Sequence, residues 1–185
     1  MRSDIILIFL KETYKVKDPV INIFMRITEK DLSYMQEAHK IKERSTCPTT
    51  KVGCVIVLNN EIIATGYNDF PTDTDRKHLT EERPMYYLLD IHAEMRAIVH
   101  ADKSIKGADV YVTTASCDNC FKHLIESGVS KVIYDNLFTK NKSTGSLDKL
   151  EAVIRLIKAS GIQQYNMQGK TFEEDLKDNG IKISY

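Results

Sequence analysis

The chain has 185 residues and a mass of 21.2 kDa, which is about one domain. Hydrophobic residues make up 42% and charged residues 28%, an ordinary composition for a globular protein that folds without disulfides. The 26 Lys and Arg balance the 26 Asp and Glu, and this net charge of zero argues against a general duplex-binding protein. It leaves open a small anionic ligand, which requires only a local basic pocket.

The first 28 residues are expected to form an N-terminal extension packed on the domain. No apolar stretch approaches the roughly 18 residues of a membrane-spanning helix, so we expect no membrane contact. The apolar run at residues 4–10 lacks the small-residue cleavage site of a signal peptide and predicts a buried strand.

The next part of the chain predicts a helix followed by a β-hairpin. Residues 29–44 predict the helix, because Thr28 can cap it and acidic residues follow in its first turn. Residues 52–67 predict the hairpin, because two β-rich runs flank the turn signal Asn59-Asn60.

Helices and strands then alternate along the chain. The expected elements are helices at 91–102, 117–126 and 147–160, strands at 110–114, 129–134 and 162–167, loops at 68–86 and 136–146, and a short helix at 172–176. Such alternation predicts parallel pairing with right-handed crossovers, and the hairpin makes the sheet mixed. The predicted fold is therefore α/β, with a five-stranded mixed sheet and helices on both faces.

Two short motifs lie at the starts of two predicted helices. His92 and Glu94 form an H-x-E motif, and Cys117 and Cys120 form a C-x-x-C motif. Two parallel crossovers bring both helix starts to one edge of the sheet, where α/β proteins bind ligands. A helix N-terminus favours the thiolate, which is the form that binds metal. Two Cys and one His suit Zn²⁺ and leave a tetrahedral position open, which is typical of catalytic sites.

Each motif alone has other interpretations. A C-x-x-C pair is also found in structural zinc sites and redox sites, and it occurs by chance. A structural zinc site requires a fourth ligand, and the remaining candidates are single residues that we expect to be structural or on the surface. They are Cys47, Cys54, His78, His100 and His123. The two motifs together favour catalytic zinc, with Glu94 as the proton carrier.

Four pieces of sequence carry a family resemblance: R-S-T-C at 44–47, G-Y-N at 66–68, H-A-E at 92–94 and C-x-x-C at 117–120. With them, the chain from about Met35 to about Met167 resembles the deoxycytidylate (dCMP) deaminases of the cytidine deaminase superfamily, including phage and viral members. The resemblance implies the three-layer α-β-α fold of that superfamily, with the deaminase domain at 29–167 and a C-terminal tail at 168–185. It implies hydrolysis of dCMP to dUMP and ammonia, for dTTP supply.

The resemblance also implies roles for individual residues. His92, Cys117 and Cys120 would bind one Zn²⁺ per subunit, and Glu94 would move protons. Asn68 would contact the sugar, Thr114 and Ala115 would border the base, and Arg44 is singled out among the cations that could bind the phosphate. The other candidates for that contact are Lys51, Arg76, Lys77 and Arg83.

The sequence departs from the family pattern at three positions. Ser116 replaces the Pro that precedes the first metal cysteine, which frees a backbone N–H and is expected to loosen the turn. Arg96 replaces an Asn and Asp69 replaces a Gly, so both are candidates for substrate specificity or effector binding. The loop after G-Y-N contains His78 but no Cys, which predicts a single zinc.

Other functions stay open at this point. The same chemistry could act on dCTP, deoxycytidine or another small aminated base. A single-stranded nucleic acid or tRNA deaminase would require a basic groove with stacking aromatics, which the charge balance disfavours. A non-catalytic zinc scaffold would give Glu94 no purpose. The resemblance implies a homo-oligomer, from dimer to hexamer, possible dCTP and dTTP effectors, and a cytoplasmic location, in the host cytoplasm if the source is viral.

Overall fold

The computed structural model describes residues 27–82, 85–137 and 147–183. The strand predicted at 4–10, nearly all of the expected N-terminal extension, and Arg83 lie outside the described residues. None of the helices in the described part has the length and hydrophobicity that a bilayer-spanning helix needs.

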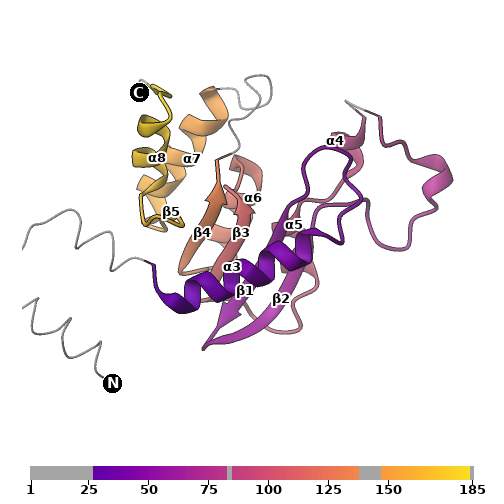
Figure 1. Cartoon of the computed structure of the whole chain (residues 1–185), viewed down its shortest axis with the longest axis horizontal. Helices are drawn as coiled ribbons and strands as arrows, with labels where there is room; N and C mark the ends of the chain where they lie inside the picture. The colour runs from indigo at the N-terminus through magenta and orange to yellow at the C-terminus, as the bar shows by residue number, and fades with distance from the viewer. Residues whose placement is uncertain (1–26, 83–84, 138–146, 184–185) are drawn as a thin grey trace, which may run out of the picture.

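The described elements alternate much as the sequence predicts (Figure 1). In chain order they are α3 (Glu29–Lys42), β1 (Gly53–Leu58), β2 (Glu61–Tyr67), η1 (Arg76–His78), α4 (Tyr86–Leu89), α5 (Ala93–Val99), β3 (Asp109–Thr114), α6 (Asp118–Glu126), β4 (Lys131–Asn136), α7 (Leu147–Ser160), β5 (Gln164–Asn166) and α8 (Phe172–Asp178).

The five strands form one mixed sheet with the order β2-β1-β3-β4-β5. Strand β1 pairs antiparallel with both β2 and β3, whereas β3–β4 and β4–β5 are parallel pairs. The predicted five-stranded mixed sheet is thereby confirmed. Because β1 runs against β3, the start of β1 lies beside the carboxyl end of β3, and Gly53 N–H donates to Thr113 Oγ1 at 3.1 Å.

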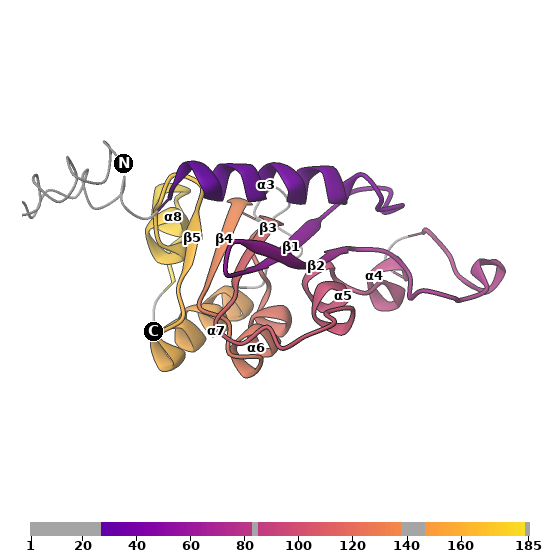
Figure 2. The ribbon, with the colours of Figure 1, turned by 90° about the horizontal axis from the view of Figure 1, so that it is seen from below.

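Helices cover both faces of this sheet, as predicted. Helix α3 lies on one face, and α5, α6 and α7 lie on the other (Figure 2). Alternate residues along each strand serve the two faces: Tyr111 packs in the cluster under α3, whereas Val110 and Val112 pack in the larger cluster under the other helices. The result is a three-layer α-β-α arrangement.

Local sequence explains how the first elements are set. Thr28 and Asp31 form a capping box at the start of α3. Asn59 and Asn60 both have positive φ, 53° and 66°, so the predicted two-residue turn joins β1 to β2. Gly53 lies against α3, where a Cβ atom would come within 2.0 Å of the Ala38 carbonyl oxygen.

Several element boundaries differ from the predictions. The helix predicted at 91–102 spans only Ala93–Val99, and the strand predicted at 162–167 spans only Gln164–Asn166. The predicted loop 68–86 contains the turn η1 and the first residue of α4. Apolar runs extend past the points where backbone partners end, so periodicity alone overestimates these elements.

The C-terminal segment packs on the domain through α8. Phe172 and Leu176 are buried in the larger core, and Tyr134 Oη donates to Asp175 at 2.8 Å inside the protein. We therefore propose that the folded domain continues through α8, instead of ending at residue 167 with a separate tail.

Candidate metal centre and pocket

His92, Cys117 and Cys120 come together at the starts of two helices. Cys117 is the N-cap of α6, with Cys120 in its first turn, and His92 is the N-cap of α5. The three ligand atoms all lie within 4.8 Å of one another. His92 Nδ1 lies 3.2 Å from Cys120 Sγ and 3.5 Å from Cys117 Sγ. Two crossovers therefore gather the predicted ligands around one point.

The electrostatics of these three groups suit a divalent cation. Hydrogen bonding from the Cys120 thiol, then from His92, lowers the pKa of Cys117 to about 3. The bond to Cys117 and burial raise the pKa of Cys120, so protein groups alone stabilise only one thiolate. Hydrogen bonding to Cys117 raises the pKa of His92 to about 9. A bound cation can compensate both sulfurs and displace these protons, so the donor set fits Zn²⁺.

Glu94 lies beside this cluster and is 4% exposed. Burial raises the pKa of its carboxyl group, and the charge of Cys117 raises it further. It is separated from His92 by one residue in the first turn of α5. A carboxyl group with a raised pKa next to a metal centre is suited to accept and return a proton.

One pocket is lined by two residues of the cluster, His92 and Cys117, and by most of the predicted substrate contacts. Glu94, Asn68, Thr114 and Ala115 all line it. The other lining residues are Thr50, Val52, Tyr87, Asp90, His92, Ala93 and Cys117. The walls thus come from the ends of β2 and β3, the segment before β1, helix α4 and the residue after it, and the starts of α5 and α6.

Asn68 builds part of this wall through its own side chain. Its Oδ1 accepts from Val52 N–H at 2.7 Å and from the Ser45 hydroxyl at 3.0 Å. Its amide nitrogen donates to the Thr50 carbonyl at 3.0 Å. The side chain is buried, with 7% of the residue exposed, and these hydrogen bonds hold residues 45–52 in place.

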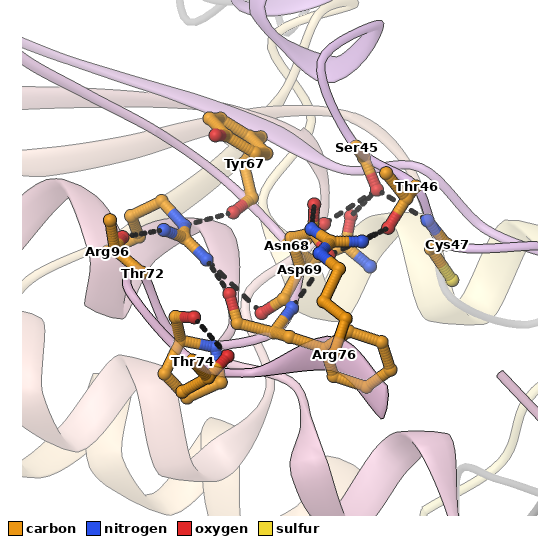
Figure 3. Close-up of polar contacts among 12 residues, drawn as sticks. Ser45, Thr46, Cys47, Tyr67, Asn68, Asp69, Thr72, Thr74, Arg76 and Arg96 are labelled. Atoms are coloured by element: carbon orange, nitrogen blue, oxygen red, sulfur yellow. Dashed lines mark hydrogen bonds and ion pairs between the residues drawn. The ribbon is translucent and has the colours of Figure 1, made fainter. Parts of the chain in front are cut away.

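The candidate phosphate-binding cations lie outside the described lining of the pocket. Arg44 is exposed, with Cζ 4.7 Å from the centre of the Tyr67 ring. Lys51 pairs with Glu43, and Lys77 pairs with Asp75. Arg76 pairs with Asp69 and also donates to Thr46 (Figure 3).

The two candidate specificity residues are both buried. Asp69 is 3% exposed, and its carboxylate accepts from the Thr46 hydroxyl, Phe70 N–H and Arg76. Burial raises the pKa of Asp69, but these hydrogen bonds outweigh burial and hold it below the usual range. Arg96 is 5% exposed, and its guanidinium faces the loop after β2 instead of the pocket.

The turn before Cys117 is held, contrary to the expectation that Ser116 loosens it. Ser116 N–H donates to Gln164 Oε1 at 3.1 Å, and Gln164 Nε2 donates to the Ser116 carbonyl at 3.4 Å. Gln164 lies on β5 and is fully buried. A side chain 48 residues away therefore satisfies the N–H that a proline would lack.

The sequence patterns missed Tyr87 and Asp90 as pocket residues. Asp90 precedes the H-x-E motif by two positions, and its Oδ1 is buried without a hydrogen-bond partner in the described part of the chain. Burial raises the pKa of this carboxyl group, whereas the His92 charge opposes the rise. Neither residue belongs to a quoted motif, and only the fold of the predicted loop brings them to the pocket.

Known proteins share this fold and this site. Residues 28–136 match the cytidine and deoxycytidylate deaminase zinc-binding region. An uncharacterized deaminase of Aliivibrio fischeri is 37% identical over 99 residues, covering 54% of this chain and 67% of its own. The deoxycytidylate deaminase of Enterobacteria phage T4 is 28% identical over 183 residues. This match covers 76% of this chain and 91% of the phage protein.

A solved structure extends the comparison to a ligand-bound enzyme. The dCMP deaminase of cyanophage S-TIM5, in complex with dCMP and dUMP, has a TM-score of 0.58 and 26% sequence identity. The match covers 75% of this chain and 97% of that one. With the family match spanning more than half of its length, this chain belongs to the cytidine and deoxycytidylate deaminase zinc-binding family.

Proposed function

We propose that this chain catalyses the hydrolytic deamination of dCMP to dUMP, with release of ammonia. The observation that carries the proposal is the position of Glu94, a buried carboxyl group that lines the same pocket as His92 and Cys117, two of the three residues in the cluster with Cys120. The similarity to the deoxycytidylate deaminase of phage T4 and to the dCMP-bound cyanophage enzyme supports dCMP as the substrate.

His92, Cys117 and Cys120 would hold one Zn²⁺. When bound, the metal would supply the nucleophile, because Zn²⁺ lowers the pKa of a coordinated water to about 7. The protein contributes three ligands, which is the number typical of catalytic zinc sites.

Glu94 would move the protons of the reaction. Its carboxylate takes a proton from the attacking water as the oxygen bonds to C4 of cytosine, and it delivers this proton to N3. It then takes the remaining proton of the new hydroxyl group on C4 and delivers it to the leaving amine. The C4–N bond breaks, ammonia leaves and the C4 carbonyl of uracil forms. Because burial raises the pKa of this carboxyl group, Glu94 can hold the proton between these steps.

The pocket walls would orient the nucleotide. Thr114 and Ala115 border the position of the base, and Asn68 borders the sugar, consistent with their place in the lining. Arg44 stays the phosphate candidate, although it lies beside Tyr67 outside this lining, so the phosphate would have to extend beyond the cavity.

Assembly, regulation and location are finer parts of the same proposal. We expect a homo-oligomer, between a dimer and a hexamer, and sensitivity to dCTP and dTTP. A substrate of deoxynucleotide metabolism favours a cytoplasmic location, which is the host cytoplasm if the source is viral.

The direct test is deamination by the purified, zinc-loaded protein. Uracil formation is followed with dCMP, dCTP, deoxycytidine and a cytosine-containing oligonucleotide in parallel. Strong preference for dCMP is the expected result. Preference for another substrate of this panel would keep the chemistry and reject dCMP, and no turnover of any of them by protein with full zinc content would reject the proposal.

A further inference from the structure

Arg96 makes an unusual set of contacts for a buried cation. Its Nε donates to the Tyr67 carbonyl at 2.8 Å, and Nη1 donates to Thr72 Oγ1 at 2.8 Å. Its Nη2 donates to the carbonyls of Phe70 at 2.7 Å and Asp69 at 3.2 Å (Figure 3). The Cζ atom lies 4.8 Å from the centre of the Tyr67 ring. One planar guanidinium group thus donates four hydrogen bonds to acceptors spread over residues 67–72.

These contacts flank the residue that builds the pocket wall. Asn68 lies between two carbonyls that Arg96 holds, those of Tyr67 and Asp69. The Asn68 side chain in turn holds Thr50 and Val52, which also line the pocket. A shift of this loop would therefore move the wall on both sides of Asn68.

The same loop is tied to the residue before a metal ligand. Asp69 and Ile91 exchange both backbone hydrogen bonds, Asp69 N–H to Ile91 O at 3.3 Å and Ile91 N–H to Asp69 O at 2.8 Å. His92 follows Ile91, and Arg96 N–H donates to the His92 carbonyl at 2.9 Å. The contacts form a closed ring, from α5 through the guanidinium to the loop and back to the start of α5.

We propose that Arg96 is a positioning residue, whose guanidinium joins helix α5 to residues 67–72 and so fixes the pocket wall built by Asn68. The partners of the buried charge are neutral carbonyls, a hydroxyl and an aromatic ring. Lysine cannot reproduce them, because an ammonium group lacks the planar fork that reaches separate acceptors at once. The kinetic consequence rests on the proposed deamination of dCMP, whereas the structural consequence does not.

The structural test is residue-by-residue hydrogen exchange of the amides in the zinc-loaded protein. The Arg96→Lys variant keeps the charge, and Arg155→Lys is its control, since Arg155 lies on α7 and pairs with Glu151 at the surface. We expect protection of the Asp69 and Ile91 amides to fall at least about tenfold in Arg96→Lys, with Val112 in β3 unchanged.

Thr72→Ala removes only one of the four contacts and leaves the buried charge in place. It should lower protection of the same two amides, by less than Arg96→Lys does. Unchanged exchange at Asp69 and Ile91 in Arg96→Lys would overturn the proposal. Equal loss of protection at Val112 would overturn it as well, because Arg96 would then support the whole fold instead of this loop.

The kinetic test separates binding from chemistry. Arg96 touches neither the metal ligand atoms nor Glu94 in the described contacts, so we expect KM for dCMP to rise about tenfold in Arg96→Lys and kcat to change less than about threefold. A fall in kcat with unchanged KM would contradict a positioning role at the pocket wall. If the wild-type protein fails to turn over dCMP while the exchange result holds, the proposed function is wrong and the placement of Arg96 stands.

Discussion

At the scale of single residues, Asp31 links the cap of α3 to the central sheet. Its carboxylate accepts from Thr28 N–H at 2.6 Å and from Tyr111 Oη at 2.5 Å, and it lies 3.5 Å from Lys131 Nζ. Burial raises the pKa of Asp31, but the hydrogen bonds from Thr28 and Tyr111 outweigh it and hold the pKa below 3.8. The unfolded chain therefore binds this proton more tightly than the folded chain does.

The sign of the pH dependence follows. The ionised Asp31 carboxylate stabilises the folded protein fully above about pH 3.8, which is the ordinary pKa of Asp. This stabilisation declines as the pH falls through the lower pKa that Asp31 has in the folded state. We expect Asp31→Ala to lower the free energy of unfolding by about 2–4 kcal/mol near neutral pH, through the lost cap and the unpaired Tyr111 hydroxyl. Urea unfolding at several pH values should show this difference shrinking in acid. Asp102 is exposed, and Asp102→Ala is the control. A difference in the free energy of unfolding between the wild type and Asp31→Ala that does not change with pH would refute the link to the pKa of Asp31.

Motif residues were predictable at this scale, whereas their neighbours were not. His92, Glu94, Cys117 and Cys120 share a spacing that zinc chemistry requires. In the structure His92, Glu94 and Cys117 line one pocket, and Cys120 is buried with its Sγ within 4.8 Å of the ligand atoms of His92 and Cys117. Asp90 belongs to no such pattern. Its place in the pocket depends on how residues 68–91 fold, which local sequence does not encode.

At the scale of elements, the contact between β2 and α5 depends on Gly66. A Cβ atom there would lie 2.1 Å from the Ala93 carbonyl oxygen and 2.6 Å from Ala97 N, both backbone atoms that cannot rotate away. We expect Gly66→Ala to cost at least about 1–3 kcal/mol and to weaken zinc binding, because α5 begins at His92.

Gly161→Ala is the matched control for this prediction. It adds the same methyl group where nothing lies within 4 Å, so it carries only the cost of its positive φ of 75°. Chemical denaturation and zinc titration measure both variants. Equal effects of the two substitutions would show that the close approach of β2 and α5 is unimportant.

A second element contact joins β5 to the turn before α6. Gln164→Met removes both hydrogen bonds to Ser116 and buries an unsatisfied N–H, for which we expect a loss of about 1–3 kcal/mol. In the Ser116→Pro background that N–H does not exist, so Gln164→Met should cost less there. A double-mutant cycle by urea unfolding measures the coupling. A coupling energy of zero would show that Gln164 does not stabilise the protein by accepting the hydrogen bond from the Ser116 N–H.

Element types were predictable from periodicity and turn signals, and their ends were less so. The Asn59-Asn60 turn was predictable because two adjacent residues with positive φ suit Asn. The short extent of β5 was not, because strand length depends on backbone partners supplied by β4. The hydrogen bond between Gln164 and Ser116 joins residues 48 positions apart, so no local sequence pattern predicts it.

At the scale of the whole molecule, the metal would connect two crossovers of the sheet. Its ligands come from the starts of α5 and α6, so bound zinc stabilises the folded state by mass action. We expect chelation to lower Tm by about 5–10 °C and to abolish turnover, with both restored by added Zn²⁺. Calorimetry with and without chelator measures this shift. In the Cys117→Ser variant, chelation should lower Tm by much less than in the wild type. A wild-type Tm that chelation leaves unchanged would argue against a metal site.

The fold class was predictable because alternating helices and strands leave few topologies open. The antiparallel pairing of β1 with β3 was not predicted, since that contact joins residues more than fifty positions apart. This pairing places Thr50 and Val52 beside the end of β3 and thereby closes the pocket.

The central claim is that Glu94 performs proton transfer at a zinc centre that acts on dCMP. The most direct measurement compares dCMP deamination and zinc content in the wild type, Glu94→Gln and Glu126→Gln, an exposed control on α6. We predict that Glu94→Gln binds zinc as the wild type does and loses about 10²–10⁴-fold in kcat, whereas Glu126→Gln is unaffected. Near-normal turnover by zinc-loaded Glu94→Gln would contradict the account.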